Sequence, residues 1–560
     1  MDCKKIYQLW VKNVNDTELS GELHDIASDP KAIADRFYRE LEFGTGGLRG
    51  VLGAGTNRMN IYTVAKATQG YCNYLKAQTK APSVAIAYDS RIHSDTFAKK
   101  AAEVFAGNGI TVYIYPKLMP TPSLSFAVRD LHCAGGVVVT ASHNPAKYNG
   151  YKVYGADGCQ ITMEAANAIQ KEIDAVDPFR NVKYCDFDPG LKDGKIAYIG
   201  EDTVERYLAA VGAQSLFPNE KQENISLVYT PLNGTGISCV PRCLREHGFS
   251  NMTIPVEQRD PNGRFPTCPY PNPEIREALQ VGLACAKKNG SEMLLATDPD
   301  CDRVGVAVED NGEYILINGN EMGVLLLDFI CKMRIAKGTM PKEPIAVKTI
   351  VTTPMAAKVA EHYGVKLINV LTGFKYIGEQ IGFLEKSGEA DRYIFGFEES
   401  YGYLSGSFVR DKDAVNASLL ICQMYAYYKA RGKTLVDVLN KLYEEYGYYE
   451  TRLKSFTFEG AVGFEKMQKL MADLRADQPA AFADFSVEKI TDYLTESVDG
   501  LPKSNVIRFS LRDGSEAVIR PSGTEPKLKI YLTTTAQDKQ KSMEKMETLD
   551  TYFQTWIKDN

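Results

Sequence analysis

The chain has 560 residues and a formal net charge of −6, with 44% hydrophobic and 24% charged residues. This length allows about three to five domains, and the composition is ordinary for a globular protein. The absence of a long basic run argues against nucleic acid as the main partner. The sequence contains no stretch of about 20 uninterrupted apolar residues, so we predict no membrane span. The N-terminal sequence lacks the apolar core of a signal peptide, and none of the 12 cysteines has CxxC spacing. We therefore expect reduced thiols and a cytoplasmic location.

The first part of the chain predicts helices, followed by a regular alternation of strands and helices. Apolar residues recur at helix-like intervals up to about Glu42. After Ser83, short β-branched runs alternate with helical segments, which predicts a mostly parallel sheet covered by helices. The predicted strands are 84–88, 110–115, 137–139 and 151–154, and the predicted helices are 95–106 and 122–129. The segment 179–202 is polar and irregular, so we place a domain boundary there.

Two further blocks repeat this alternation, and the last block differs from them. The second block predicts helices at 203–212, 237–247 and 274–288, with strands at 225–229, 293–296 and 304–308. The third block predicts helices at 319–332, 354–362 and 413–429, and strands at 345–349, 366–370 and 393–397. A further helix is predicted to begin after the turn at 371–375. The last predicts strands at 451–458, 506–511, 517–520 and 529–534, with helices at 464–474 and 539–556. We expect three consecutive α/β domains with mixed sheets, at 1–202, 203–320 and 321–449, and a C-terminal α+β domain at 450–560.

Three of the predicted apolar strands run directly into short polar loops. These strands end at Val139, Ala296 and Phe397. Ligands of open α/β sheets bind at the carboxyl ends of the strands. The three loops are therefore the first places to look for a functional site.

The loop after the second of these strands contains Asp298, Asp300 and Asp302, which we call the aspartate triad. In an extended segment this spacing puts all three carboxylates on one face, where they repel one another unless a cation is bound. Oxygen ligands favour Mg²⁺ or Ca²⁺. A calcium EF-hand is excluded, because Arg303 stands where that loop requires glycine and strands flank the segment. Mg²⁺ usually takes a phosphate oxygen as well, and Ser142 could carry that phosphate.

The loop after the first of these strands reads Thr-Ala-Ser-His-Asn-Pro from residue 140. A hydroxyl beside an imidazole at the end of a buried strand suits a nucleophile, Ser142, and a proton acceptor, His143. The alternative is an ordinary turn of small polar residues. Lys152 lies on the next predicted strand and brings a cation near the serine.

Five other segments carry groups that suit anion or sugar binding, although each alone is also compatible with a turn. The glycines of 43–50 let backbone amides approach an anion, and Arg49 adds a guanidinium. Segment 520–526 combines an arginine, two hydroxyls and a glycine, which suits a phosphate-binding nest. The remaining polar segments are 372–375, 396–400 and 410–413.

Together these motifs resemble those of the α-D-phosphohexomutase family. TASHNP with the following NGYKVYG is similar to the family's phosphoserine loop, and DPDCDR to its DPDADR metal loop, with Cys301 in place of alanine. FGTGGLR resembles the FGTSGLR segment, with Gly46 in place of the usual serine, and FEES resembles the GEES sugar-binding loop, with Phe397 where glycine is common. RPSGTEP resembles the RxSGTEP phosphate-binding loop. The motifs occur in the family's order over nearly the whole chain.

The resemblance implies four domains around a central active-site cleft and assigns roles to residues of this chain. Ser142 would carry the phosphoryl group, with Mg²⁺ between that phosphate and the aspartate triad. Arg303 would neutralise charge on the moving group, and His143 or Lys152 would take the hydroxyl proton, with His143 as the first candidate. The implied substrate-binding residues are Arg49, Thr372, Gly373, Lys375, Glu398, Ser400, Lys412, Arg520, Ser522, Gly523 and Thr524.

The chain is most similar to the longer phosphoglucomutase/phosphopentomutase branch of the family. This similarity implies an intramolecular phosphotransferase that interconverts α-D-glucose 1-phosphate and glucose 6-phosphate, with glucose 1,6-bisphosphate as intermediate and activator. Pentose or mannose phosphates as substrates, and a sugar-bisphosphate synthase, remain alternatives. A regulator that only binds sugar phosphates would need neither Ser142 nor a complete triad. The expected partner is a sugar monophosphate, and we expect a monomer or a homodimer.

Overall fold

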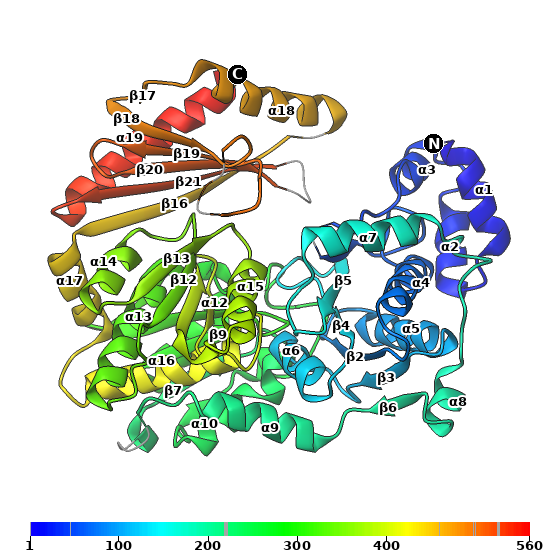
Figure 1. Cartoon of the computed structure of the whole chain (residues 1–560), viewed down its shortest axis with the longest axis horizontal. Coiled ribbons are helices and arrows are strands. Elements are labelled where there is room, and N and C mark those ends of the chain that lie inside the picture. The colour runs from blue at the N-terminus through cyan, green and yellow to red at the C-terminus, as the bar shows by residue number, and fades with distance from the viewer. Residues whose placement is uncertain are drawn as a thin grey trace.

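The computed structural model describes residues 2–44, 46–217, 222–458, 460–496, 498, 500–522 and 527–559. In these residues, four β-sheets follow one another along the chain, and helices pack against each of them (Figure 1). In the described residues, no helix has both the length and the apolar character needed to cross a membrane. All 12 cysteines are free thiols, as the scattered cysteine positions predict.

Three short helices precede the first sheet: α1 (Cys3–Asn13), α2 (Thr17–Asp25) and α3 (Pro30–Phe37). Each begins after an aspartate whose side chain accepts hydrogen bonds from the free N–H groups of the first turn. Trp10 and Phe37 lie at the centre of a small core that also contains Ala54, which follows the first strand. This extension therefore packs against the first domain.

The first sheet is mixed and has the strand order β1-β5-β4-β2-β3-β6. Its strands are β1 (Gly47–Val51), β2 (Ser83–Tyr88), β3 (Thr111–Ile114), β4 (Gly135–Val139), β5 (Tyr148–Gly155) and β6 (Ile196–Tyr198). Its helices are α4 (Ile61–Gln78), α5 (Ser94–Gly107), α6 (Thr121–Asp130), α7 (Met163–Asp174) and α8 (Phe187–Lys192). The strands β4, β2, β3 and β6 are parallel, whereas β5 is antiparallel to β4 and β1. Part of the glycine-rich segment, which suggests a flexible turn by itself, forms β1, because Leu48 is buried and pairs with Tyr151.

The second sheet has the order β11-β10-β9-β7-β8. Its strands are β7 (Leu227–Thr230), β8 (Met252–Thr253), β9 (Met293–Thr297), β10 (Val304–Asp310) and β11 (Glu313–Ile317). The helices here are α9 (Glu201–Gly212), η1 (Gln222–Asn224), η2 (Thr235–Ser238), α10 (Val240–Glu246), α11 (Val256–Arg259) and α12 (Arg276–Asn289). β9 and β10 form an antiparallel pair, so the loop 298–303 is the turn of a hairpin.

The third sheet has the order β13-β12-β14-β15. Its strands are β12 (Ile345–Thr349), β13 (Lys366–Val370), β14 (Tyr393–Glu398) and β15 (Gly402–Leu404). The helices here are α13 (Gly319–Ala336), α14 (Met355–His362), α15 (Phe374–Lys386), η3 (Ala390–Arg392), α16 (Ala414–Lys429) and α17 (Leu435–Tyr446). β15 is antiparallel to β14, so the loop 399–401 turns the chain back on itself.

The C-terminal sheet is antiparallel in every pair and has the order β16-β21-β20-β19-β18-β17. Its strands are β16 (Tyr448–Thr457), β17 (Ala481–Phe482), β18 (Phe485–Asp492), β19 (Ile507–Leu511), β20 (Glu516–Pro521) and β21 (Lys527–Ala536). The helices α18 (Gly460–Asp477) and α19 (Lys539–Asp559) complete this part. The predicted fold class, three mixed α/β domains and a C-terminal α+β domain, is confirmed.

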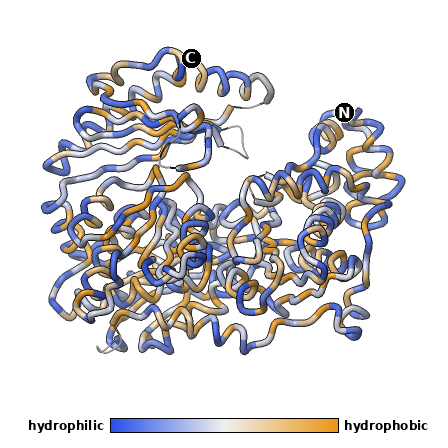
Figure 2. Tube along the Cα trace, in the orientation of Figure 1, coloured by the Kyte–Doolittle hydropathy of each residue, from blue (hydrophilic) through white to orange (hydrophobic). Residues whose placement is uncertain are grey.

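One continuous hydrophobic core joins the first three sheets, and hydrophobic segments run through the interior of all parts of the molecule (Figure 2). Two buried tyrosines add polar links between distant segments. The Tyr154 hydroxyl donates to the Asp411 carboxylate at 2.7 Å, and the Tyr207 hydroxyl donates to the Asp413 carboxylate at 3.0 Å. These contacts hold the segment after β15 against the first two domains, which places Lys412 between them.

Candidate active site

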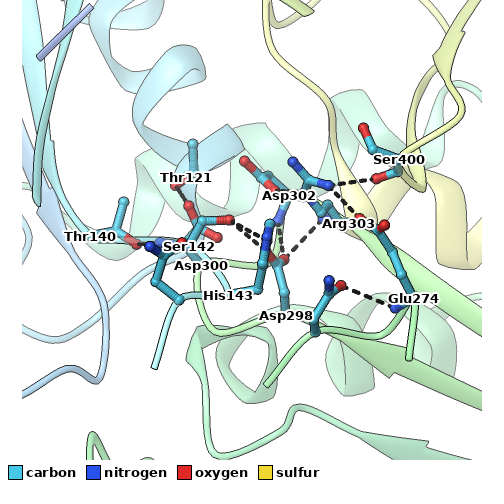
Figure 3. A network of polar contacts seen from close by, with 12 residues as sticks. Thr121, Thr140, Ser142, His143, Glu274, Asp298, Asp300, Asp302, Arg303 and Ser400 are labelled. Atoms are coloured by element: carbon cyan, nitrogen blue, oxygen red, sulfur yellow. Dashed lines mark hydrogen bonds and ion pairs between the residues drawn. The ribbon is translucent and has the colours of Figure 1, made fainter. Parts of the chain in front are cut away.

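Ser142 lies at the end of the buried strand β4, in a loop that faces the second sheet (Figure 3). Its Oγ donates a hydrogen bond to the Asp298 carboxylate at 2.9 Å and lies 3.3 Å from Nδ1 of His143. Its backbone N–H donates to the Thr140 hydroxyl at 2.8 Å. The hydroxyl, the imidazole and the aspartate triad therefore meet at one point, although Ser142 and Asp298 are 156 residues apart.

Arg91, at the carboxyl end of β2, holds the Ser142 loop in place. Its side chain is fully buried and forms an ion pair with Asp89 at 3.3 Å. The guanidinium donates to the backbone carbonyls of Ser142, Asn144 and Pro145 in the loop and of Tyr148, the first residue of β5. The Asp89 carboxylate also accepts from the Thr140 hydroxyl at 2.6 Å. A buried arginine that satisfies several carbonyls fixes the backbone of the loop.

The aspartate triad is buried, and one carboxylate oxygen from each of its residues lies within 4.8 Å of the other two. The Asp298 Oδ1 atom accepts from the backbone N–H groups of Asp302 and Arg303, which closes the turn. Oδ1 of Asp300 and Oδ1 of Asp302 are buried without any hydrogen-bond partner in the described residues. Free carboxylate oxygens at this spacing fit a hard divalent cation such as Mg²⁺.

Two lysines neutralise part of the charge of the triad. Nζ of Lys152, on β5, lies 2.8 Å from Asp300 Oδ2 and 3.4 Å from Asp302 Oδ2. Nζ of Lys412 lies 2.9 Å from Asp302 Oδ2. Burial alone would lower the pKa of Lys152, but the carboxylates of Asp300 and Asp302 raise it above its usual value. Lys152 is therefore a cation at neutral pH.

The protein environment shifts the pKa values of His143 and Asp298 in opposite directions. Burial, together with the charges of Arg303 and Arg49, lowers the pKa of His143 well below its usual value, so its ring is neutral at pH 7. Burial and the neighbouring carboxylates of Asp300 and Asp302 raise the pKa of Asp298. A neutral imidazole beside the Ser142 hydroxyl can accept a proton.

Arg303 connects the loop of the aspartate triad to the third domain. Its Nη1 atom donates to the Glu274 carboxylate at 2.6 Å and to the Ser400 carbonyl at 2.9 Å (Figure 3). Burial would lower the pKa of Arg303, but the carboxylates of Glu274 and Asp302 raise it. The guanidinium is therefore a permanent charge at the edge of the triad.

The loop after β14 brings Glu398 and Ser400 to the same region. Glu398 is buried, and the Ser400 hydroxyl lies 3.4 Å from its carboxylate. Burial raises the pKa of Glu398 to about 7, against the opposing effect of the Lys412 ammonium. The neighbouring Glu399 turns away and accepts hydrogen bonds from the hydroxyls of Thr349 and Thr352. The two adjacent glutamates therefore contact different partners.

The other predicted binding residues lie on several elements. Arg49, on β1, is exposed and donates to the Asn144 side chain at 3.4 Å. Thr372 and Gly373 come directly before α15, and Lys375 lies in its first turn. Gly373 has a φ of 123°, which glycine adopts most easily. Arg520 and Ser522 lie at the end of β20, and Gly523 and Thr524 fall outside the described residues.

Arg520 lies close to the third domain. Burial raises the pKa of Tyr376, on α15, and the Arg520 charge opposes that rise. The same two effects act on Tyr531, whose pKa is also influenced by Glu398 and Glu399. Arg520 is two residues from Val518 on β20 and therefore shares its face of the sheet. Val518 belongs to the cluster that contains Ile350 and Leu371 of the third domain, so this face is turned toward the third domain.

Three family models match the chain in succession. They are phosphoglucomutase/phosphomannomutase alpha/beta/alpha domain I at residues 40–179, domain II at 205–312 and domain III at 318–446. The chain belongs to the phosphoglucomutase/phosphomannomutase family. The predicted resemblance to the α-D-phosphohexomutases is confirmed.

Relatives within the phosphoglucomutase/phosphomannomutase family match almost the whole chain. A phosphoglucomutase of Staphylococcus aureus strain N315 is 36% identical over 546 residues, which is 95% of this chain and 96% of that protein. A phosphoglucomutase/phosphomannomutase family protein of Burkholderia thailandensis has the same fold, with a TM-score of 0.67, 19% identity and coverage of 92% and 97% of the two chains. Parafusin, a phosphoglucomutase of Paramecium, in its open form, has a TM-score of 0.66 at 18% identity, with coverage of 90% and 92%.

The structure of this phosphoglucomutase/phosphomannomutase family member adds residues that the sequence analysis missed. Arg91 and Asp89 hold the Ser142 loop, Thr121 donates to Asp300 Oδ2 at 3.1 Å, and Glu274 pairs with Arg303. Asp89 and Arg91 could have been found from the Asp-Ser-Arg sequence that follows the predicted strand 84–88. This sequence comes directly after a strand, as the other polar loops do. Glu274 gave no signal, because a single glutamate before a helix is common.

Proposed function

We propose that this enzyme is a phosphoglucomutase that interconverts α-D-glucose 1-phosphate and glucose 6-phosphate. The observation that carries the proposal is the 2.9 Å hydrogen bond from Ser142 Oγ to a carboxylate of the buried aspartate triad. This hydrogen bond places a candidate nucleophile beside a candidate cation site. The chain is also 36% identical to a phosphoglucomutase over nearly its full length. A phosphoserine enzyme needs this combination of nucleophile and cation, because phosphoryl transfer depends mainly on positioning and charge neutralisation.

In the proposed resting state, Ser142 carries a phosphoryl group. Asp298, Asp300 and Asp302, with a phosphate oxygen on Ser142, would hold Mg²⁺, which supplies positive charge that stabilises the phosphoryl group during transfer. Lys152 and Lys412 keep the triad partly neutral, and Arg303 offers a permanent charge to the moving group. The donor set fits this role, because two of its buried oxygens have no other hydrogen-bond partner in the described residues.

In the transfer step, the P–O bond to Ser142 breaks and a P–O bond to the free sugar hydroxyl forms. The hydroxyl loses a proton and the departing Ser142 Oγ gains one, so no net proton is released. We assign this relay to His143, whose neutral ring lies 3.3 Å from Oγ. Lys152 is the weaker candidate, because its ammonium is paired with two carboxylates and already carries its proton. The product of this step is glucose 1,6-bisphosphate, and its other phosphate returns to Ser142 in the second half-reaction.

The substrate is proposed to lie between the Glu398 loop and the C-terminal domain. Glu398 and Ser400 would bind ring hydroxyls, and Lys412 would contact the sugar phosphate. The phosphate that is not transferred would bind at Arg520, Ser522, Gly523 and Thr524. Arg49, Thr372, Gly373 and Lys375 would complete the binding surface. Added glucose 1,6-bisphosphate would act as an activator, because it can phosphorylate Ser142 directly.

The test is a turnover assay by phosphorus NMR with glucose 1-phosphate, mannose 1-phosphate and ribose 1-phosphate. Each substrate is supplied with Mg²⁺ and a trace of glucose 1,6-bisphosphate. We expect a strong preference for glucose 1-phosphate. Preference for the pentose or for mannose would change the substrate assignment, and no turnover of any of the three would favour a sugar-bisphosphate synthase or a protein that only binds sugar phosphates.

A further inference from the structure

The proline- and asparagine-rich segment 260–274, between α11 and α12, is packed into the second domain. The backbone N–H of Asn262 donates to the Asn233 carbonyl at 3.0 Å, and the Asn233 side chain donates to the Asp260 carbonyl at 2.8 Å. The Gln258 side chain donates to the Thr267 hydroxyl at 3.1 Å. These bonds hold the segment in one conformation, although its composition suggests a solvated loop.

The segment contacts Arg91 near its start. The Phe265 ring is buried, and the Arg91 guanidinium lies 5.1 Å from its centre. Gly263 allows this approach, because a Cβ atom there would come within 2.4 Å of the Ile92 nitrogen and 2.6 Å of the Ser90 carbonyl oxygen. A cation placed over the face of an aromatic ring is attracted to that face. Phe265 thus packs on the arginine that holds the Ser142 loop.

The same segment contacts Arg303 at its end. The Glu274 carboxylate accepts from Nη1 of Arg303 at 2.6 Å, and the same nitrogen donates to the Ser400 carbonyl. Nε of Arg303 is buried without a hydrogen bond in the part of the chain that the structure describes, and it lies 3.7 Å from Asp302 Oδ1. Glu274 therefore fixes one side of the guanidinium and leaves Nε directed at the triad (Figure 3).

We propose that segment 260–274 is a positioning loop for phosphoryl transfer, in which Glu274 orients Arg303 and Phe265 holds Arg91. One rigid segment then fixes two arginines from different domains. Arg91 sets the position of Ser142, and Arg303 sets the charge at the edge of the triad. The distance between the nucleophile and the cation site depends on both. This inference rests on the proposed phosphoglucomutase function.

The first test compares Glu274→Gln with the matched control Glu277→Gln, an exposed glutamate in the first turn of α12. We expect Glu274→Gln to lower kcat by about 10- to 100-fold, the scale of an about 1 Å misplacement in an active site, with the KM for glucose 1-phosphate changed by less than about twofold. Glu274→Asp should recover part of the loss, and Glu277→Gln should match the unmodified enzyme. Unchanged kcat in Glu274→Gln, or an equal loss in both variants, would overturn the role of Glu274.

A double-variant cycle separates positioning from a general structural effect. If Glu274 acts only through Arg303, then Glu274→Gln should slow the Arg303→Lys enzyme by much less than it slows the unmodified enzyme. Fully additive losses would contradict this coupling. The melting temperatures of all variants identify any loss that reflects unfolding.

The contact between Phe265 and Arg91 is tested by comparing Phe265→Leu with the control Tyr270→Leu. Tyr270 lies in the same segment and is 60% exposed. We expect Phe265→Leu to slow phosphorylation of Ser142 by glucose 1,6-bisphosphate, measured by mass spectrometry, and Tyr270→Leu to leave it unchanged. Equal rates in the two variants would refute the role of Phe265.

A readout that does not depend on turnover distinguishes this inference from the proposed function. The arginine Nε–H signals are recorded by ¹⁵N NMR, and the Arg303 signal is assigned as the one missing from Arg303→Lys. Glu274→Gln should shift this signal and Glu277→Gln should not. An enzyme that turns over none of the three sugar phosphates but shows this shift would contradict the function alone. An active enzyme without the shift would contradict the positioning role alone.

Discussion

Ser142 has a positive φ of 52°, a left-handed conformation that costs a residue other than glycine about 1–3 kcal/mol. Cys301 in the loop of the aspartate triad and Tyr401 in the loop after β14 have the same kind of backbone, with φ of 55° and 64°. Each of the three strand-end loops therefore contains one strained residue. Such strain persists only where the surrounding contacts outweigh it, as the Arg91 hydrogen bonds do around Ser142.

At Ser142, replacement by alanine removes the proposed nucleophile and little else. The methyl group of alanine fits in the same space, so we expect an unchanged far-UV circular dichroism spectrum and a melting temperature close to that of the unmodified enzyme. Turnover should fall by on the order of 10⁴-fold or more, as for loss of a nucleophile in other enzymes. Near-normal turnover by Ser142→Ala in the phosphorus NMR assay would exclude the phosphoserine mechanism.

From the raised pKa of Glu398, we predict that substrate binding depends on pH. Burial raises its pKa to about 7, so the carboxyl is protonated below that pH and ionised above it. Only the ionised form accepts hydrogen bonds from sugar hydroxyls with both oxygens. The KM for glucose 1-phosphate should therefore fall as the pH rises from about 6 to about 8.

The control for this prediction is Glu398→Gln at the same pH values. The substrate phosphate also titrates near pH 6, but that effect is common to both proteins. The KM of the glutamine variant should lack the additional change near pH 7. Parallel pH profiles for the two proteins would mean that Glu398 does not control binding.

At the scale of elements, the site depends on where strands end. β4, β9 and β14 are buried and each runs directly into a polar loop, so the apolar residues fix the strand and the loop carries the chemistry. β9 and β10 form a hairpin, which holds the aspartate triad in a tight turn. Lys152 and Lys412 reach this turn from other elements.

The metal assignment predicts how the enzyme responds to chelation. EDTA should stop turnover, and Mg²⁺ should restore it. The protein should remain folded without metal, because Lys152 and Lys412 already offset part of the charge of the triad. Removal of the ion should still lower the melting temperature, since a ligand that binds only the native state stabilises it. Full activity after complete removal of divalent ions would refute the assignment of the triad.

At the scale of the whole molecule, residues from four domains must converge. The first three share one core, whereas the C-terminal sheet packs on the third through a separate small cluster. In this cluster Ile350 and Leu371 from the third domain meet Val518 and Tyr531 from the C-terminal sheet. The position of Arg520 relative to Glu398 depends on this contact.

Ile350→Ala should therefore loosen the C-terminal domain. Removing a buried isoleucine side chain lowers the free energy of unfolding by about 2–5 kcal/mol. Here the lost contacts are those between the third domain and the C-terminal domain. We expect faster amide hydrogen exchange in β19 and β20, no change in β2 and β4, and a higher KM for glucose 1-phosphate. Exchange that increases equally in all four strands would indicate a general loss of stability instead.

The sequence by itself determined the fold class and most strands, because apolar runs and helical periodicity are local properties of the chain. β12 and β13 lie at the predicted residues, 345–349 and 366–370. Helix α4 was missed because it buries Thr68, Gln69 and Gly70 as well as its apolar residues, so no amphipathic stripe marks it. The proposed chemistry of the triad and of Ser142 could also be stated from the sequence, since it rests on residue types at short spacing.

Only the tertiary structure decided how these parts meet. Ser142 and Asp298 are 156 residues apart, and the hydrogen bond between them depends on how two domains pack. The contact of Phe265 with Arg91 crosses two domains, and the ion pair of Glu274 with Arg303 joins residues 29 positions apart, so no local sequence pattern encodes either contact. The charge states follow the same rule: a neutral His143, a charged Lys152 and a Glu398 that titrates near pH 7 result from burial and from neighbours that the fold supplies.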